Sequence, residues 1–419
     1  MPTEWPEVRL GDLIEIKHGW PFKSEFFSED LTGKPIVINI GNFQYTGGFR
    51  FDSTALKEYR DTYPEGYELT PGDVLLVMTC QTSGGEILGI PGRVPADGRT
   101  YLHNQRMGKV VIKHPSDVDI GFLYWLFLWK DFNRELATSA SGTKILHTSP
   151  TRIEAFRLNL PPLQTQRRIA RILGALDDEI ELNRKMNETL AQMARAIFKS
   201  WFVDFEPFRD KGMVDSPLGE VPNGWLVGDL ESLCTQIVRG VTPKYAKGSG
   251  RLVINQRANR GSSLDCAEFK EIDPTLVVPD AQKAHRYDVL VNSLGEGTLG
   301  RIHLFQGEDR VFAVDQHMTI CRPKSRALAC YIYNTLAGPD GQRRIESLKT
   351  GSTGMTMLNI SRLRSMEVVI PPDAALTRFG IRVLPLYERV AADQTQEGIL
   401  AAIRDALLPK LMSGEVEVR

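Results

Sequence analysis

Three short segments of the chain gather basic, amide and aromatic side chains. The first, Lys17 to Lys23, holds two lysines, a histidine, a tryptophan and a phenylalanine. The other two, Arg239 to Tyr245 and Asn255 to Arg260, together hold arginines, asparagines, a glutamine, a lysine and a tyrosine. Arginine, asparagine and glutamine can form paired hydrogen bonds with guanine or adenine, and basic side chains bind phosphates. These segments could therefore contact nucleic acid, although the same residue types also occur on ordinary solvated surfaces.

Familiar catalytic patterns are missing from the sequence. An ATP-binding GxxxxGK[ST] motif is absent because both candidate Gly-Lys pairs, at 33–34 and 108–109, lack the following serine or threonine. Asn159 to Leu163 has the wrong order for the [ND]PP[FY] motif of adenine methyltransferases and lacks its aromatic residue. Pro279 to Lys283 is loosely similar to a nuclease motif but has no acidic-x-lysine partner, and the seven histidines form no HExxH or Ser/His pattern. We therefore predict no catalytic residues and no metal site.

The composition is that of an ordinary globular protein with room for two or three domains. The 419 residues are 42% hydrophobic and 25% charged. Five cysteines without a CxxC pair indicate neither a disulfide framework nor a zinc site, and they fit a reducing cytoplasm. No apolar run is long enough to cross a bilayer, and acidic Glu7 and Asp12 stand where a signal peptide has its apolar core. We expect neither membrane insertion nor secretion.

A long internal repeat organises the chain. With an offset of 210 positions, Pro161 to Phe202 aligns with Pro371 to Met412 without a gap. Apolar residues three or four apart in both copies predict two long helices, each with one buried face. Upstream, Asn104 to Met107 recurs as Asp315 to Met318, with drifting spacing that places the insertions in loops. The repeated unit is therefore one globular region followed by one long helix.

Each globular half is predicted to mix strands and helices. Short aliphatic runs between turn residues predict strands at Ile36 to Ile40, Val74 to Met78, Val110 to Ile112, Leu252 to Ile254, Asp288 to Val291 and Met318 to Cys321. One helix is expected in each half, at Gly121 to Leu136 and Arg326 to Thr335. Long glycine-rich stretches between the strands are either recognition loops or simple connections.

The seam of the first long helix has a polar middle. Its predicted members are Ile169, Ile172, Leu176, Ile180, Asn183, Asn187, Leu190, Ala194, Ile197 and Trp201. Asp393 and Glu397 hold the equivalent polar places in the second helix. Asparagine in a helix seam fixes register at the expense of stability, so antiparallel pairing would bring the polar centres together. The alternative is that each helix covers only its own domain, but a helix over 165–201 would be roughly 55 Å long and exceed one small domain. Pro385 predicts an irregular stretch in the second helix.

Two segments carry a family resemblance. PPLQTQRRIARILGALDDEIELNRKMNETLAQMARAIFKSWFVDFEP, at 161–207, resembles the central conserved region of specificity subunits of type I restriction-modification systems. LLPKLMSGEVEV, at 407–418, resembles the distal conserved end of that family. The second helix departs from the pattern because it opens with PPDAALTRF and lacks the usual Pro-Pro-x-x-x-Gln. The resemblance implies an α+β fold, in which two similar mixed α/β target-recognition domains are joined by two long antiparallel helices that form a coiled coil, with internal pseudo-two-fold symmetry.

The resemblance also implies a division of the chain and a function. Target-recognition domains are expected at 1–160 and 211–370, a central conserved helix at 161–210 and a distal one at 371–419. The implied protein is a cytoplasmic, non-catalytic subunit without a cofactor. It would read a bipartite double-stranded DNA target with one domain per half-site, and dock two methyltransferase subunits and, through them, restriction and translocase subunits. A net charge of −1 and a pI near 6.7 predict weak DNA binding until partners add basic surface.

Two other hypotheses stay open at this point. One is a duplicated-domain scaffold or regulator without sequence-specific DNA binding, which the nearly neutral charge favours. The other is the specificity part of a fused methyltransferase or nuclease, against which the missing motifs count.

Candidate contact residues follow from the loops and the helix ends. For DNA we predict Lys17, Lys23, Gln44, Tyr45, Gln81, Thr82, Arg106, Lys144, Lys244, Tyr245, Gln256, Arg257, Arg260, Ser293, His317 and Lys349. For partner subunits we predict the apolar helix ends, which exceed what a helix pair alone must bury: Phe198, Trp201, Phe202, Leu407, Leu408 and Leu411.

Overall fold

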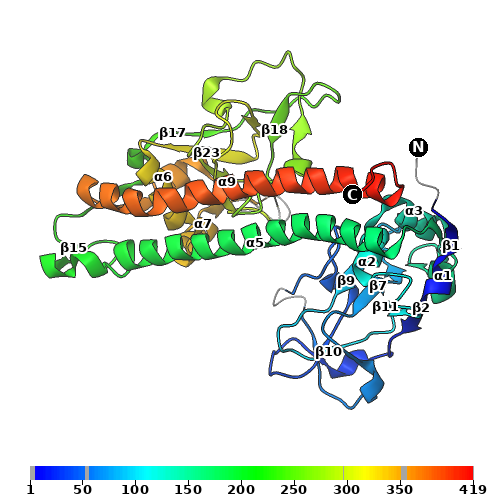
Figure 1. The fold of residues 1–419 in the computed structure, drawn as a ribbon. Coiled ribbons are helices and arrows are strands. Elements are labelled where there is room, and N and C mark those ends of the chain that lie inside the picture. Colours follow the sequence, from blue (N-terminus) through cyan, green and yellow to red (C-terminus); the bar gives the residue numbers. More distant parts are fainter. Residues whose placement is uncertain (1–4, 52–55, 296, 351–355, 419) are drawn as a thin grey trace. The chain divides into compact units, whose positions relative to one another are not determined.

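The chain divides into two compact units. A computed structural model describes residues 5–51, 56–295, 297–350 and 356–418. Unit 1 comprises residues 1–180 and 399–419, and unit 2 comprises 181–398. Two long helices, α5 (Leu163–Phe202) and α9 (Asp373–Met412), each contribute one part to each unit (Figure 1). Within the described part of the chain, no helix has the length and apolarity needed to cross a membrane.

Unit 1 is built on two sheets. The antiparallel sheet has the order β2-β11-β7-β9, made of β2 (Ile14–His18), β11 (Met107–Ile112), β7 (Val74–Val77) and β9 (Pro91–Arg93). The other has the order β3-β5-β4-β10-β6, made of β3 (Phe27–Ser28), β5 (Glu58–Tyr59), β4 (Ile36–Val37), β10 (Tyr101–Leu102) and β6 (Glu68–Leu69). Two short pairs complete the unit: β1 (Glu7–Arg9) with β13 (Arg157–Asn159), and β8 (Thr79–Cys80) with β12 (Leu146–His147).

Unit 2 repeats the same plan. Its four-stranded sheet has the order β17-β23-β20-β21, made of β17 (Cys234–Arg239), β23 (Met318–Pro323), β20 (Val289–Asn292) and β21 (Ile302–Leu304). β18 (Leu252–Ile254) runs parallel to β22 (Ala313–Val314), as β4 runs parallel to β10, and antiparallel to β19 (Lys270–Glu271). The remaining pairs are β16 (Leu226–Asp229) with β26 (Glu367–Ile370), β14 (Met213–Val214) with β15 (Val221–Pro222), and β24 (Lys349–Thr350) with β25 (Met357–Leu358). The internal repeat of the sequence is thus a repeat of structure.

A pair of helices covers the sheet of each unit where one helix was predicted. In unit 1, α2 (Ile120–Leu128) and α3 (Lys130–Ser139) are separated at Trp129, whose backbone is extended. In unit 2, α6 (Arg326–Ala337) is followed by α7 (Pro339–Ser347), which the sequence analysis did not predict. Asp119 and Ser325 accept hydrogen bonds from the first turns of α2 and α6 and so mark the helix starts. The short helices are α1 (Leu10–Leu13), α4 (Pro150–Glu154) and α8 (Ile360–Arg364).

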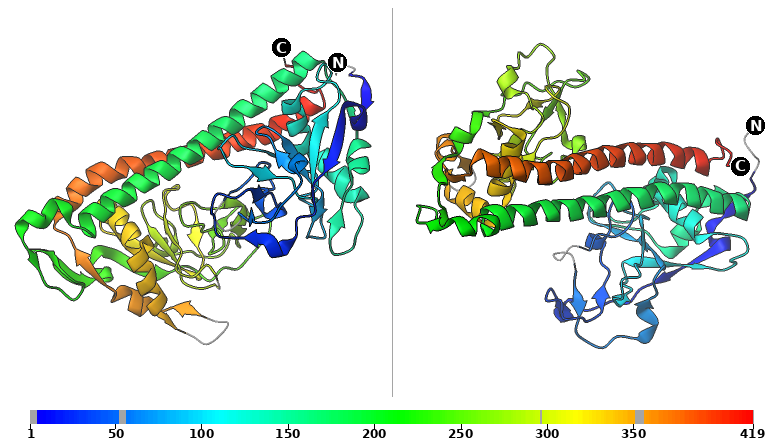
Figure 2. Two further views of the ribbon diagram at one scale, coloured as in Figure 1. Left: turned by 90° about the horizontal axis from the view of Figure 1, so that it is seen from below. Right: turned by 60° about the vertical axis from the view of Figure 1, so that its left-hand side comes forward.

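The long helices pack side by side in an antiparallel sense within both units (Figures 1 and 2). In unit 1, Asp177 of α5 forms an ion pair of 2.6 Å with Arg404 of α9. In unit 2, the Asn187 amide donates to a Glu397 carboxylate oxygen at 2.9 Å. These contacts confirm the predicted pairing and the meeting of polar residues at the middle of the helices.

The seam differs from the prediction at one place, and the proline does not interrupt the helix. Ile172 is 37% exposed, whereas Leu173 is fully buried, because position 173 follows Ile169 by one full helical turn. Pro385 lies inside a continuous α9 with its side chain exposed. The predicted irregular stretch is therefore not seen.

Candidate DNA interface

A polar hollow of about 850 Å³ opens in unit 1. The aromatic rings of Phe22, Phe27, Phe43 and Tyr45 line it. Amide and guanidinium groups also reach it, from Asn39, Gln44, Arg50, Gln81, Asn104, Gln105 and Arg106. A concave surface that presents several amide and guanidinium groups can read base edges by hydrogen bonds.

The turn before β11 forms one wall of this hollow. Asn104 is buried, and its amide donates to the Asn39 side-chain oxygen at 3.0 Å. The Asn104 side-chain oxygen accepts the backbone N–H of Arg106 at 3.2 Å. These bonds fix the turn, while the side chains of Gln105 and Arg106 remain exposed.

The corresponding turn before β23 in unit 2 is built around a buried carboxylate. One oxygen of Asp315 accepts the backbone N–H of His317 at 2.8 Å and lies 2.7 Å from the His317 Nδ1. The other oxygen accepts the Tyr245 hydroxyl at 3.0 Å. Partial burial and the neighbouring Asp315 carboxylate raise the pKa of Tyr245 to about 12. Asp315 thereby holds two of the predicted contact residues.

Unit 1 brings together half of its predicted contact residues. Gln44, Tyr45, Gln81 and Arg106 all line the hollow. Lys17, Lys23, Thr82 and Lys144 are exposed but do not line it. The Thr82 hydroxyl donates to the Glu86 carboxylate, so its proton is already used in a hydrogen bond within the protein.

The predicted residues of unit 2 are more often paired within the protein. Lys244 forms an ion pair of 2.7 Å with Asp273, Arg260 one of 2.9 Å with Asp265, and Lys349 one with Glu346. Arg257 is exposed, whereas Gln256, like His317, is half-buried.

Ser293 must be removed from the candidates. Its side chain is fully buried, and its hydroxyl shares a hydrogen bond of 2.6 Å with the Thr319 hydroxyl. A hydroxyl that is satisfied inside the sheet cannot reach DNA, so this prediction was wrong.

The apolar helix ends that were predicted to bind partner subunits pack inside the protein. Trp201 and Phe202 are buried in the core of unit 2, where Phe198 packs against them. Leu408 and Leu411 are buried in the core of unit 1, where Leu407 is partly buried. The globular regions thus absorb the apolar surface that a helix pair alone would leave over.

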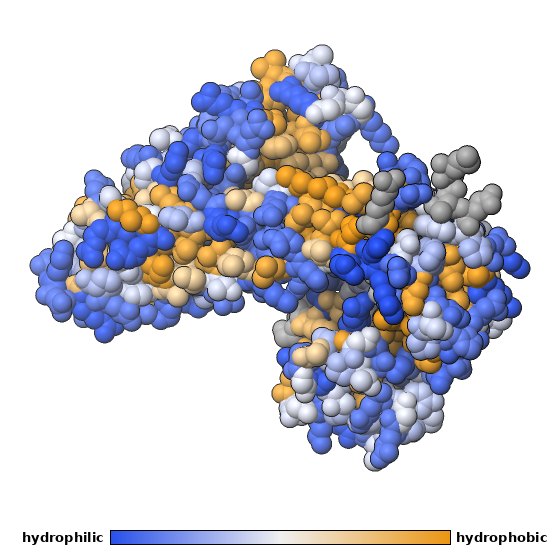
Figure 3. All heavy atoms as spheres, viewed as in Figure 1, coloured by the Kyte–Doolittle hydropathy of each residue, from blue (hydrophilic) through white to orange (hydrophobic). Residues whose placement is uncertain are grey.

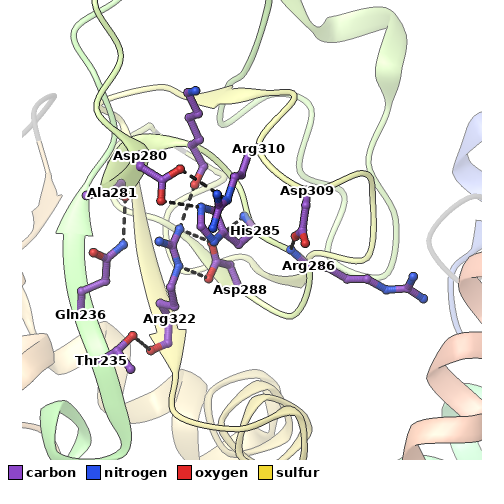
Figure 4. Close-up of polar contacts among 11 residues, drawn as sticks. Thr235, Gln236, Asp280, Ala281, His285, Arg286, Asp288, Asp309, Arg310 and Arg322 are labelled. Atoms are coloured by element: carbon purple, nitrogen blue, oxygen red, sulfur yellow. Dashed lines mark hydrogen bonds and ion pairs between the residues drawn. The ribbon is translucent and has the colours of Figure 1, made fainter.

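A charged network in unit 2 stabilises the turn that leads into β20 (Figure 4). Asp288 is buried and accepts two hydrogen bonds from Arg322, both at 2.9 Å. Burial raises the pKa of Asp288, and Arg322 opposes this effect. Asp280 faces His285 at 3.2 Å and Arg310 at 3.5 Å. The segment that was loosely similar to a nuclease motif therefore takes part in ion pairs, and no cluster of His, Cys, Asp or Glu suited to a metal ion occurs among the described residues.

Several residues of the candidate interface were not among the predicted contact residues. Asn39, Asn104 and Gln105 line the hollow of unit 1, and Asp315 and Gln316 form the turn of unit 2. The repeat of Asn104 to Met107 as Asp315 to Met318 marked both turns. That signal could have found them. A turn that occurs in both halves with partly different side chains is suited to the recognition of two different half-sites.

Comparisons with known proteins agree on one family. Residues 2–192 match the family model described as the type I restriction modification DNA specificity domain. The type I restriction enzyme MjaIX specificity subunit of Methanocaldococcus jannaschii is 27% identical over 100% of this chain and 95% of its own length. The HindI specificity subunit of Haemophilus influenzae is 23% identical over 90% of this chain and 98% of its own.

A solved structure extends the likeness to the fold. The S subunit of a type I restriction-modification system from M. genitalium superposes with a TM-score of 0.61 at 15% identity, covering 97% of this chain and 96% of that one. The two structures share two β-rich units and two paired long helices. The match to the specificity domain and to the specificity subunits of two type I restriction enzymes supports a non-catalytic subunit that recognises a DNA target. The family model, the two relatives matched over nearly their whole length and the shared fold all bear out the resemblance of this chain to type I restriction-modification specificity subunits.

Proposed function

We propose that unit 1 and unit 2 each read one half of a bipartite double-stranded DNA target. The observation that carries this proposal is the repeated sheet order, with an equivalent turn before β11 and before β23 that bears different side chains. Equivalent frames with different exposed groups suit two readers of similar geometry and different sequence preference.

The proposed division follows the repeat. Residues 1–160 and 211–370 act as target-recognition domains, and 161–210 and 371–419 supply the central and distal conserved helices. Both long helices run from one unit into the other along the chain, so their length bears on the spacing between the half-sites. A target with a fixed gap follows from helices of fixed length.

We assign the partner surface to exposed apolar residues on the long helices. Met193 of α5 and Ile403 of α9 hold equivalent places in the repeat and are 48% and 42% exposed. Apolar surface is visible along the C-terminal part of α9 (Figure 3). One such surface in each unit fits the docking of two methyltransferase subunits in the cytoplasm, with restriction and translocase subunits joining through them. Their basic surface would compensate for a net charge of −1 in this chain.

Two measurements test the proposal. Sequencing of modified adenines in cells with and without this chain, expressed with its methyltransferase subunits, should reveal a split motif that depends on the chain. Footprints without sequence preference would instead favour a scaffold or regulator. Light scattering of the co-expressed complex should give two methyltransferase subunits per chain, and a stable one-to-one species that accepts no second copy would contradict the docking of two.

A further inference from the structure

We propose that the turns Asn104-Gln105-Arg106 and Asp315-Gln316-His317 are the base-reading elements of the two units, and that Asp315 is the positioning residue that aims His317. The inference rests on the proposed bipartite reading and names the residues that perform it.

The two turns share one backbone frame. In unit 1, Trp20 donates to the His103 carbonyl at 2.8 Å and its own carbonyl accepts from Gln105 at 3.0 Å. In unit 2, Val241 donates to the Val314 carbonyl at 2.7 Å and accepts from Gln316 at 2.8 Å. Asparagine in one turn and aspartate in the other then accept the backbone N–H two residues on. Side chains at equivalent positions therefore leave the two turns from the same backbone geometry.

A glycine holds each turn against its neighbouring segment. A Cβ at Gly19 would lie 2.3 Å from the Asn104 backbone, and a Cβ at Gly240 would lie 2.1 Å from the Val314 carbonyl oxygen. Such approaches leave no room for any side chain. The turns are thus rigid platforms, which a base-reading element needs for its directional hydrogen bonds.

The side chains of the unit 2 turn are oriented by internal bonds. Because the buried Asp315 carboxylate lies 2.7 Å from Nδ1, Nδ1 of His317 carries a proton, and the imidazole in its neutral form presents Nε2 as an acceptor. The Gln316 side-chain oxygen accepts the Thr242 hydroxyl at 2.7 Å, which leaves its NH₂ group to donate. His317 is therefore suited to a base with a major-groove amino group, adenine or cytosine, and Gln316 to guanine or thymine.

The unit 1 turn offers different chemistry on the same frame. Neither the Gln105 amide nor the Arg106 guanidinium has a side-chain partner within the described part of the chain. An unpaired guanidinium at the edge of a polar hollow is suited to the O6 and N7 acceptors of guanine. The Gln105 amide can present its oxygen and its NH₂ group together and is therefore suited to paired hydrogen bonds with adenine.

The test exchanges the distinctive residues between the turns. The full chain is co-expressed with its methyltransferase subunits, and modified adenines are mapped by sequencing. His317→Arg should change one base of one half-site toward guanine, lowering the preference for the original base roughly tenfold to a hundredfold. Arg106→His should do the same in the other half-site. Asp315→Asn should weaken the base preference at the position that His317→Arg alters. It should leave the other half-site unchanged. Glu308→Gln is the control variant, because Glu308 is exposed and its replacement also raises the net charge by one. It should leave the motif unchanged.

The outcomes separate this inference from the proposed function. A split motif that His317→Arg leaves identical would overturn the inference alone, whereas the lack of any split motif in the unchanged protein would overturn the proposed function. If His317→Arg abolishes methylation, the assembled complex that contains this variant is assayed for DNA binding. Its binding to the intact target is compared with its binding to duplexes in which one half-site is scrambled. Loss of discrimination at one half-site only supports the inference. Loss of assembly, or of discrimination at both half-sites, overturns it.

Discussion

Gly19 and Gly240 are single residues on which a whole turn depends. Because a Cβ at Gly19 would lie 2.3 Å from backbone atoms of Asn104, Gly19→Ala must displace the turn or the strand β2 before it. We expect a loss of about 1–3 kcal/mol in the free energy of unfolding and weaker recognition of one half-site. Chemical denaturation measures the first effect and methylation mapping the second. Gly66→Ala, where the added Cβ meets nothing within 4 Å, is the matched control; equal stability of both variants would refute the role given to Gly19.

Two buried histidines make stability depend on pH. Burial lowers the pKa of His103 in unit 1 and of His303 in unit 2 to about 4, and each contacts a carbonyl oxygen, of Met107 at 2.8 Å and Gly261 at 2.9 Å. Unfolding exposes imidazoles with an ordinary pKa near 6.5, so between pH 6.5 and 4 the unfolded chain binds more protons than the folded one. Stability is therefore full above about pH 6.5 and falls as the pH drops toward 4, by about 3 kcal/mol for each histidine.

His103→Gln tests this dependence. The amide keeps a donor for the Met107 carbonyl but cannot take up the proton, so the decline in unfolding free energy between pH 6.5 and 4 should become shallower. Denaturation of both proteins at several pH values measures it. An unchanged slope would show that His103 does not contribute.

The polar residues in the middle of the long-helix pair lower the stability of the protein. Asn183 is buried, and its side-chain NH₂ has no hydrogen-bond partner within the part of the chain that the structure describes. We predict that Asn183→Leu raises the free energy of unfolding by about 1–2 kcal/mol, because it removes an unsatisfied amide and adds apolar contact. Register should loosen at the same time, since the seam loses a polar group. Thermal unfolding measures the first effect; a lower midpoint than that of the unchanged protein would contradict it.

The elements that could be predicted from sequence are those in which apolar residues recur at regular spacing. The long helices α5 and α9 and the strands β7 and β23 follow apolar spacing, which one chain segment displays by itself. The break at Trp129 could not be predicted because no proline or glycine marks it. Ser293 was misplaced because its polar side chain is satisfied by Thr319, a partner brought near only by the sheet. Within the candidate site, residue type suggested Gln44 and Arg106, whereas the supporting roles of Asn104 and Asp315 required three-dimensional contacts.

At the scale of the whole molecule, we propose that the length of the long helices determines the gap between the half-sites. Inserting roughly seven residues after Asn187, with a compensating insertion after Glu397, adds two helical turns, about 10 Å, and approximately preserves the facing of each helix. We predict a methylation motif with unchanged half-sites and a gap wider by about three base pairs. Methylation mapping measures the gap. An active complex with an unchanged gap would show that the helices do not determine the spacing.

The exchange of one whole reading region tests whether each unit reads its own half-site. Loops between residues 11 and 160 are replaced by those of a relative with a different target, the long helices are kept, and modified adenines are mapped; the reciprocal protein exchanges loops between 228 and 370. We predict that each exchange alters one half of the split motif and leaves the other half and the gap unchanged, because each unit has its own sheet, core and reading turn. A change in both halves from either exchange would contradict independent reading by the two units, since it would mean that they form one composite reading surface.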